Sequence, residues 1–427
     1  MYNNKLIITL VILCISSFTT HAIGYNDSVK IGPDIFIIGY NLSENDFLLS
    51  NQTYLVNNTS DISLVLQSVI DGTDQIGGTI LLKEGTYVLN QPIVLKNLVH
   101  LKGEGIDETI IIASDYGSQG LIQAQTINNT AISNMTLDGN KYLQNNDNGK
   151  HGIDIQGCNN VYIGHLKIVD FQGHGIYAHG MNELIDISNI VSKNNDLNGI
   201  TIIETYIGLI QNSIIINNSC DGIRLVCLTT SAKVTNSHIS NNNGDGISIN
   251  QSYPIILMDN VIENNDGNGI FTDNSNDIIV RNNTIMVYKY HYYGCNILVQ
   301  NSDINTIDIY DNKLFGGKSA GICIINVQNT LLDNNIIDDM CMCYIFNSSS
   351  IVMTNNICNA EILYQNDGTS SIQNINNIYQ YTVCSNMLNK TKTNHTKNSH
   401  QKNGTHNLIT VYFYSWIAVI LSFFIFI

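Results

Sequence analysis

Short apolar segments alternate with polar corners along most of the chain. In segments such as Val161–Ile163 and Ile278–Val280, apolar side chains are spaced for one buried face, and an Asn, a second apolar pair and an Asn-Asn or Asn-Gly turn follow. Alternation with a period of two, bounded by Asn and Gly, is typical of β-strands and not of helices. The pattern therefore predicts many short strands joined by tight corners.

The strand pattern repeats at a nearly constant interval. The dipeptide Gly-Ile marks it six times, with spacings of 23, 24, 23, 24 and 23 residues, and weaker marks at Gly294 and Gly321 extend it with spacings of 25 and 27. A unit this short cannot bury its own apolar face, but stacked units can when each pairs with the last as a parallel strand layer. The six marks are Gly152, Gly175, Gly199, Gly222, Gly246 and Gly269.

Stacked units of this length predict an all-β fold, a single-stranded right-handed parallel β-helix, which is a solenoid with coils of about 23 residues. The Leu-x-x-Leu-x-Leu pattern of leucine-rich repeats is absent, and propeller blades are about twice as long. An Asn recurs one unit apart at Asn189, Asn212, Asn236 and Asn260. We expect their amides to hydrogen-bond from coil to coil as an Asn ladder.

The beginning of the repeat region differs from the rest. Residues 61–75 are amphipathic with a helical period. We expect a helix there that caps the first coil, because an open solenoid end would expose core and strand edges. The region 61–113 resembles the start of pectate-lyase-like β-helices. The expected apolar face of the helix comprises Ile62, Val65, Leu66, Val69 and Ile70.

Both ends of the chain carry targeting signals. Lys5, the apolar run Leu6–Ile15 and the small residues Thr20 and Ala22 predict a signal peptide. The apolar final segment is long enough to span a bilayer, but no Lys or Arg follows it as a stop-transfer flank, which predicts a glycosylphosphatidylinositol signal or a membrane anchor. We therefore expect a secreted protein held at the cell surface. The expected organisation is signal peptide 1–22, N-terminal segment 23–60, β-helix 61–384, polar linker 385–407 and hydrophobic tail 408–427.

In an exported protein, cysteines can form disulfides and N-x-S/T sequons can carry glycans. One such sequon is at Asn250. Removing Cys14 with the signal leaves nine of the 10 cysteines, an odd number, so at least one is unpaired or bonded to another chain. Cys341-x-Cys343 has no second pair at zinc-ligand spacing. We expect no metal site of this kind.

Composition narrows the classes of function. Hydrophobic residues make up 44% of the chain, enough for a core, and charged residues only 13%. The excess of 35 Asp and Glu over 19 Lys and Arg gives a net charge of −16, which repels phosphate backbones and argues against a nucleic-acid partner. The same charge opposes a polyanionic substrate. We expect the protein to be a monomer.

The coil register predicts which side chains share an outer surface. The Ile after each marker Gly points inward, so the residues two and four positions after the Gly point outward and stack from coil to coil. Tyr177 and His179 then share one strand and one face. The polar residues gathered on two adjacent coils are Lys150, His151, Asp154, Gln156, His174, Tyr177 and His179, and Arg224 lies two coils further along.

Several runs resemble the catalytic β-helix modules of mannuronan C5-epimerases. They are Met135–Asn140, Asn195–Ile200 and Asn217–Val226, and with the capping region the similarity covers 61–290. Those enzymes carry a Tyr-Gly-Phe-Asp-Pro-His-Glu motif. The matching segment here reads His-Gly-Ile-Tyr-Ala-His-Gly over residues 174–180.

The resemblance implies that His179 stands for the motif's His and Lys150 for the family's lysine. The motif's Tyr is replaced by His174 and its Asp by Tyr177, and its Pro and Glu are absent. It also implies a pectate-lyase-like fold and an acidic polysaccharide as partner, acted on at C5.

Epimerising or eliminating a uronate requires a neutralised C6 carboxylate, a base for the C5 proton, and either an acid on the opposite face or a leaving oxygen. We expect Lys150 or Arg224 to hold a carboxylate. His179 is the expected base, and Tyr177 or His174 the acid. The expected substrate-binding residues are Arg224, Asp154, His151 and Gln156.

Three alternatives stay open. Gly173-His174-Gly175 is similar to a polygalacturonase run, but the paired Asp that hydrolysis needs are absent near it. Pectate lyases bind calcium, for which Asp221, Asp245 and Asp273 are candidate ligands, although stacked Asp also serve as corner residues. A non-catalytic glycoprotein or adhesin that uses the β-helix as a rigid stalk fits the net charge and the Asn250 sequon in the row of His179.

Overall fold

The computed structural model describes the chain between residues 32 and 379. Within these limits the residues not described are 33, 41, 44, 47–49, 51, 58–59, 74–75, 115–119, 144–148, 288–293, 303–305, 317–319, 339–341, 359–360 and 366–370. The expected signal peptide, polar linker and hydrophobic tail lie outside the described residues. Among the described residues, no helix has the length and apolar character needed to cross a bilayer.

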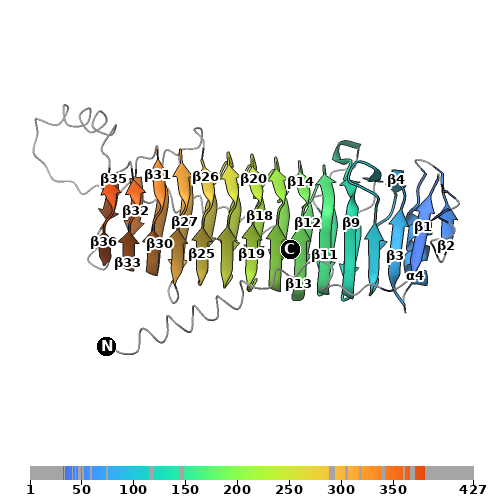
Figure 1. The fold of residues 1–427 in the computed structure, drawn as a ribbon, viewed down its shortest axis with the longest axis horizontal. Helices are drawn as coiled ribbons and strands as arrows, with labels where there is room; N and C mark the ends of the chain where they lie inside the picture. Colours follow the sequence, from blue (N-terminus) through green and yellow to red (C-terminus); the bar gives the residue numbers. More distant parts are fainter. Residues whose placement is uncertain are drawn as a thin grey trace, which may run out of the picture. The chain divides into compact units, whose positions relative to one another are not determined.

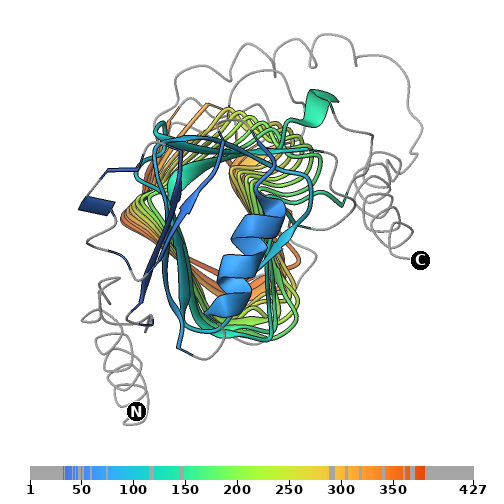
Figure 2. The same cartoon turned by 90° about the vertical axis from the view of Figure 1, so that its right-hand side faces the viewer.

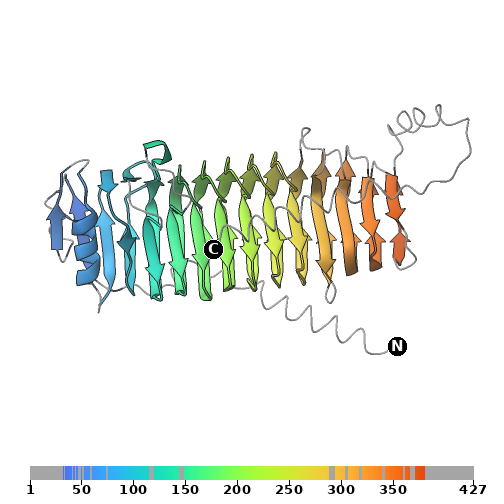
Figure 3. The ribbon, with the colours of Figure 1, turned by 180° about the vertical axis from the view of Figure 1, so that it is seen from behind.

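The strands wind into one long parallel β-solenoid (Figure 1, and from behind in Figure 3). Each coil presents up to three strands, one on each of three faces, and each strand pairs in parallel with its counterpart in the next coil. This confirms the predicted fold. Three long strands continue around a corner: β9 and β11 span the second and third faces, and β30 spans the first and second.

The first face, called the Gly–Ile face here, holds the strands that begin at or near the repeat marks. It contains β5 (Ile93–Val94), β8 (Ile122–Gln125), β10 (Ile153–Gln156), β12 (Ile176–His179), β15 (Ile200–Ile203), β18 (Ile223–Val226), β21 (Ile247–Asn250), β24 (Ile270–Asp273), β27 (Cys295–Ser302), β30 (Ala320–Asp333), β32 (Met342–Phe346) and β35 (Glu361–Gln365).

The other two faces complete each coil. The second contains β1 (Ile35–Gly39), β2 (Gln52–Leu55), β3 (Gly78–Leu82), β6 (Val99–Lys102), β9 (Asn128–Asp138), β11 (Asn159–Val169), β13 (Asn182–Ser188), β16 (Thr205–Gln211), β19 (Ala232–Thr235), β22 (Ile255–Met258), β25 (Ile278–Arg281), β28 (Ile307–Tyr310), β33 (Ser349–Thr354) and β36 (Ile372–Ile375). The third contains β4 (Gly85–Leu89), β7 (Thr109–Ala113), β14 (Val191–Lys193), β17 (Ile214–Ile216), β20 (His238–Ser240), β23 (Val261–Glu263), β26 (Thr284–Met286), β29 (Lys313–Phe315), β31 (Ile336–Asp338), β34 (Ile357–Cys358) and β37 (Ile378–Tyr379).

Close approach of successive coils explains why glycine marks the repeat. A Cβ added at Gly175 would lie 2.6 Å from the carbonyl oxygen of Gly199, the equivalent residue one coil later. The following Ile side chains stack inside the solenoid, fully buried, at Ile153, Ile176, Ile200, Ile223, Ile247 and Ile270. Burial of each such side chain stabilises the fold by about 1.5–3 kcal/mol.

The expected mark at Gly294 is wrong by two residues. Ile270 pairs with Ile297, so Asn296 occupies the place of the marker glycine in that coil. The register follows the residue that fills the core: Ile297 points inward, whereas Cys295 takes the position before the marker. Hydrophobic burial, not the Gly-Cys dipeptide, therefore sets the coil boundary here.

Two Asn ladders run along the inside of the corners, and their register corrects the predicted column. Asn189, Asn212 and Asn236 adopt left-handed backbone angles, with φ of 55°, 51° and 49°, and the equivalent residue is Asp259 (φ 59°), not Asn260. Asn260 instead aligns with the buried ladder position that follows, where its Oδ1 accepts the N–H of Ser237 at 3.0 Å. In an Asn-Asn corner the first Asn thus makes the turn and the second forms the ladder.

The predicted capping helix is confirmed as α4 (Ser63–Gly72), which buries Leu66, Val69 and Ile70. Figure 2 shows it lying across the mouth of the first coils. The sequence pattern predicted that the β-helix starts at residue 61. In the structure, β1 and β2 precede the capping helix, and β1 pairs in parallel with both β2 and β3. A short 3-10 helix, η1 (Lys141–Leu143), follows β9.

Removing one ladder amide should destabilise the whole solenoid. Asn218 Oδ1 accepts the N–H and Nδ2–H of Asn195, and its own Nδ2 donates to Asn242 Oδ1 at 2.9 Å. We expect Asn218→Ala to lower the free energy of unfolding by about 2–4 kcal/mol, because several buried polar groups lose partners. Asn217→Asp, at the exposed turn position beside it, is the matched control for urea unfolding. Equal stabilities of the two variants would contradict the ladder's role.

Candidate active site

The candidate site lies on two neighbouring strands of the Gly–Ile face, β10 and β12. Asp154 pairs with Tyr177 and Gln156 with His179 in the parallel register. On β12, Ile176 and Ala178 point inward and are buried, while Tyr177 and His179 point outward and are half-buried. The structure therefore brings the predicted side chains together on one outer surface.

Tyr177 is the centre of a cluster of aromatic rings. Its ring centroid lies 4.5 Å from that of His179, 4.8 Å from that of His151 and 5.2 Å from that of His174. His151 and His174 stack on each other at 5.1 Å. Rings in contact restrict each other's rotation, so the phenol and the three imidazoles are held in defined positions.

His179 is oriented by a carboxylate from the preceding coil. Its Nε2 lies 3.1 Å from Asp154 Oδ1, and the side chains are 25% and 16% exposed. Donation from Nε2–H to the carboxylate assigns the proton to Nε2 and leaves the Nδ1 lone pair as an acceptor. Sequence analysis assigned Asp154 to substrate binding; in the structure it positions His179.

His151 and His174 belong to a column of residues that precede the marker glycines, called the corner column here. The N–H of His174 donates to His151 Nδ1 at 3.0 Å, and the N–H of Asn198 donates to His174 Nδ1 at 3.1 Å. The same bond repeats with carboxylate or amide oxygens further along. The corner column comprises His151, His174, Asn198, Asp221, Asp245, Asn268 and Cys295.

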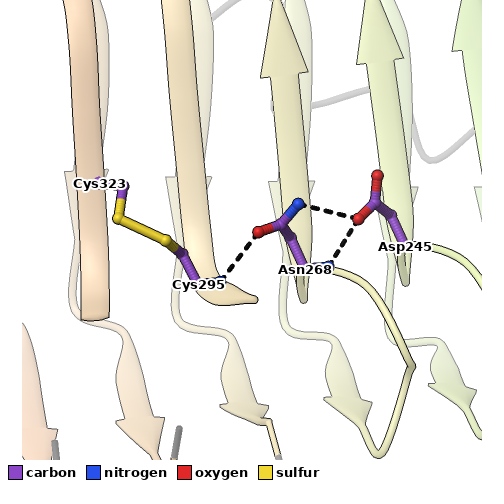
Figure 4. The surroundings of a disulfide bond; sticks show 4 residues. All are labelled: Asp245, Asn268, Cys295 and Cys323. Atoms are coloured by element: carbon purple, nitrogen blue, oxygen red, sulfur yellow. Dashed lines mark hydrogen bonds between the residues drawn. A yellow bond between two sulfur atoms is a disulfide. The ribbon is translucent and has the colours of Figure 1, made fainter. Parts of the chain in front are cut away.

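Figure 4 shows the far end of the corner column, where Asp245 and Asn268 are linked by hydrogen bonds. The column ends at a disulfide between Cys295 and Cys323, on neighbouring strands β27 and β30. Free thiols are found at Cys158, Cys220 and Cys227. The expectation that at least one cysteine is unpaired therefore agrees with the described part of the chain.

Burial determines the protonation of the two imidazoles in the corner column. Burial lowers the pKa of His151 to about 4, and burial, with neighbouring positive charge, lowers the pKa of His174 well below its usual value. Both rings are therefore neutral at pH 7, with Nδ1 as acceptor and Nε2–H as donor. Thr201, which sequence analysis did not single out, also contacts His174 Nδ1 through its hydroxyl at 3.2 Å.

Tyr177 keeps its proton. Burial raises the pKa of its phenol, and the Asp154 carboxylate adds to the effect. The site thus combines an acceptor on His179 with a neutral O–H donor on the adjacent ring. Such a pair can remove one proton and supply another, which is what general base and acid catalysis requires.

The remaining predicted residues lie at different depths. Gln156 is exposed beside His179, but Lys150 is only 2% exposed, which leaves little of it for a ligand to touch. Arg224 is half-buried in the row of Tyr177, with Thr201 between them. A carboxylate bound by Arg224 would therefore belong to a different sugar from the one at His179.

The three candidate calcium ligands do not form one group. Asp221 and Asp245 are neighbours in the corner column, whereas Asp273 lies in the row of His179, where it accepts from Asn301 Nδ2 at 2.8 Å. Among the described residues, no three His, Cys, Asp or Glu side chains are grouped as metal ligands. Calcium binding stays a prediction without an assigned site.

Comparison with known proteins identifies the architecture. The family model described as right handed beta helix region matches residues 119–285 and 174–337, which together cover about half of the chain. The A-module of mannuronan C-5 epimerase AlgE6 from Azotobacter vinelandii has a similar fold, with a TM-score of 0.65 and 19% identity over 76% of this chain and 96% of that module.

Two curated relatives carry the same name. Mannuronan C5-epimerase AlgE1 of Azotobacter vinelandii is 26% identical over 227 residues, which are 48% of this chain and 16% of the relative. AlgE5 of the same organism is 26% identical over 237 residues, 49% of this chain and 23% of the relative. The matched segment spans about a fifth of the length of these relatives.

Replacing His174 separates its structural bond from its imidazole. Asn occupies the next position of the corner column, so we expect His174→Asn to accept the Asn198 N–H and to retain the stability of the parent. His174→Ala leaves that N–H without its acceptor and should lower the free energy of unfolding by about 1–3 kcal/mol. Chemical denaturation of both variants checks this. A destabilised Asn variant would show that the imidazole itself is needed for packing.

A second position in the column gives a pH-dependent prediction. Burial raises the pKa of Asp245 to about 7, with a further contribution from the Asp221 carboxylate. Between about pH 4 and pH 7 the folded state thus keeps a proton that the unfolded state has lost, so this group lowers stability as the pH rises. Asp245→Asn keeps the acceptor oxygen but cannot titrate. It should gain stability over the parent across that window, by an amount on the order of a few kcal/mol.

The test is the difference in melting temperature between Asp245→Asn and the parent from pH 4 to pH 8. The low pKa of His151 makes stability rise with pH in both proteins, so it cancels in the difference. The two curves should meet near pH 4 and separate towards pH 7. Parallel curves would contradict an Asp245 carboxyl that stays protonated in the folded state up to about pH 7.

Proposed function

The chain belongs to the right-handed β-helix family, and on that premise we propose that it acts on a uronate-containing polysaccharide by removing the C5 proton of a uronate. One observation carries the proposal: His179, held by Asp154, lies against the neutral phenol of Tyr177 on one outer face. The similarity to mannuronan C5-epimerases supports the same class of chemistry.

The proposed reaction starts at His179. Its Nδ1 takes the C5 proton as the C5–H bond breaks, and the electron pair is delocalised into the C6 carboxyl group. An epimerase then returns a proton to the opposite face of C5, for which Tyr177 is the proposed donor and the neutral His174 the alternative. A lyase instead expels the oxygen on C4, and a C4–C5 double bond forms. Arg224 is the proposed cation for the carboxylate of another sugar of the same chain, because the nearly complete burial of Lys150 leaves little of it for a ligand to touch.

The proposed location is the outer surface of the cell. It rests on the targeting signals in 1–22 and 408–427, which lie outside the described residues. A second candidate is a non-catalytic surface glycoprotein that binds glycans, and two observations favour it: the net charge of −16 and the sequon at Asn250. A stalk, however, does not require a carboxylate-oriented imidazole beside a half-buried phenol.

Proton exchange at C5 tests the proposal directly. The full chain is incubated in deuterated water with uronate-containing polysaccharides, polymannuronate and pectate included. Deuterium at C5 without new ultraviolet absorbance indicates an epimerase, and new absorbance indicates a lyase. We expect His179→Ala to slow exchange roughly 10²–10⁴-fold, as loss of a general base does.

A matched control exists on the third face. His238 also pairs with a carboxylate, since its Nε2 lies 3.0 Å from Glu263 Oε1, but it belongs to β20. His238→Ala should leave exchange unchanged. Absence of exchange on every glycan, or equal rates for the His179 and His238 variants, would exclude the proposed chemistry and favour the glycan-binding glycoprotein.

A further inference from the structure

Large apolar side chains stand exposed at the corner that follows the strands of the Gly–Ile face. Met181 is 71% exposed, Tyr206 60%, Leu228 60% and Tyr253 44%. They follow β12, β15, β18 and β21, which are four successive coils. Single exposed apolar residues are ordinary, but a group of them on successive coils marks a binding surface, and here the exposed carboxylates of Glu183 and Glu204 lie among them. These four residues are called the corner patch here.

The corner patch borders the candidate site. It starts at Met181, two residues after His179. The row that contains His179 continues through the half-buried Ile203 and the buried Val226, so it is apolar for two coils before it reaches Asn250. A ligand at the candidate site that extends along the solenoid would therefore pass over apolar surface.

The spacing of the tyrosines suits a glycan. The N–H of Thr230 donates to Thr205 O and the N–H of Tyr253 donates to Thr229 O, which places Tyr206, Thr230 and Tyr253 at equivalent positions of three successive coils. Two coil steps separate the two phenol rings, about 10 Å. This is close to the length of two pyranose rings in an extended chain. The apolar faces of such rings stack on aromatic side chains that keep a polar edge in water.

The charges beside the patch are unsuited to a polymer with a carboxylate on every sugar. From β10 to β24, the rows of Tyr177 and His179 contain one permanent cation, Arg224, whereas Asp154 and Asp273 are anions of the same rows. A sugar ring and a coil have similar lengths, so a polyuronate would bring a carboxylate to each coil. Most of these would meet apolar side chains or carboxylates, where their desolvation is not compensated.

The position of Arg224 matches a wider charge spacing. Tyr177 pairs with Thr201, and Thr201 pairs with Arg224, so the cation lies two coils from the reacting position. If one uncharged sugar lies between two uronates, the uronate at His179 and the next uronate are separated by the same distance, about 10 Å. The sugar between them would lie over Ile203 and Tyr206, where the exposed carboxylate of Glu204 disfavours a second negative charge.

The surface formed by His179, Arg224, Tyr206 and Tyr253 is called the track here. We propose that the track binds a glycan in which uronate residues alternate with uncharged sugars, with one carboxylate at the His179 site, the next at Arg224 and neutral rings on Tyr206 and Tyr253. The proposal rests on the proposed function of the same site and narrows its substrate class from uronate polymers in general to sparsely charged ones. The net charge of −16 acts in the same direction, because it repels a densely charged chain more strongly.

Calorimetric titration of the full chain with three octasaccharides tests the proposal. The probes are alternating glucuronate and N-acetylglucosamine, a homopolymer of mannuronate, and an uncharged chain of N-acetylglucosamine. We expect the alternating glycan to bind at least tenfold more tightly than the other two. Tyr206→Ala and Leu228→Ala should each weaken its binding about tenfold, and Arg224→Gln should weaken it and reduce its dependence on salt.

Leu64→Ala is the matched control, because Leu64 is 72% exposed on the distant capping helix and the substitution should leave binding unchanged. The substituted patch residues are also exposed, and melting curves of each variant verify folding. Equal or tighter binding of the mannuronate homopolymer, unchanged binding after Tyr206→Ala and Leu228→Ala, or no binding of any probe would each overturn the proposal.

The C5 exchange assay keeps this proposal separate from the proposed function. Patch-dependent binding of the alternating glycan without C5 exchange would support the track and remove the enzymatic role. Exchange on polymannuronate that is unaffected by Tyr206→Ala would support the enzyme and remove the track.

Discussion

Every corner of the solenoid faces the same physical constraint, which is that a turning backbone leaves N–H groups that strand pairing does not satisfy. The structure meets it with side-chain acceptors supplied by neighbouring coils. Asn218, for example, accepts from Asn195 and donates to Asn242, so each coil is bonded to the coils on both sides. An unsatisfied buried N–H costs about 1–3 kcal/mol, and these bonds therefore decide which residues can occupy the corners.

Part of the candidate site is built from these corner acceptors. The corner column accepts its backbone bonds through Asp, Asn or His side chains, and only at its first two positions are these imidazoles, His151 and His174. Their Nδ1 atoms are committed to the backbone, burial keeps both rings neutral, and both rings lie against Tyr177. A structural bond thus positions the groups that surround the phenol, and the imidazole of His179, outside the column, is left to act as the base of the proposed reaction.

The solenoid also determines what kind of ligand can follow the site. Because each coil advances by one strand spacing, the outer rows present one side chain about every 4.8 Å, a scale similar to that of a sugar ring. The row of His179 becomes apolar at Ile203, whereas the row of Tyr177 stays polar through Thr201 and Arg224. The candidate site therefore lies beside a stretch in which one row offers apolar contact and the other offers polar groups.

The sequence by itself determined the fold, the approximate coil length and the shared face of Tyr177 and His179, because glycine at close coil contacts and alternating apolar residues are local signals of fixed period. It could not determine the ladder register: Asn260 and Asn236 look equivalent, yet one forms the ladder and the other makes the turn. Nor could it separate Cys295 from Ile297 as the residue that fills the core. The choice of hydrogen-bond partner depended on the tertiary structure. Asp154, for example, binds His179, which lies diagonally opposite it on the neighbouring strand. The same holds for the burial of Lys150 and the exposure of Tyr206, because the accessibility of a side chain is set by neighbouring coils and not by its own repeat.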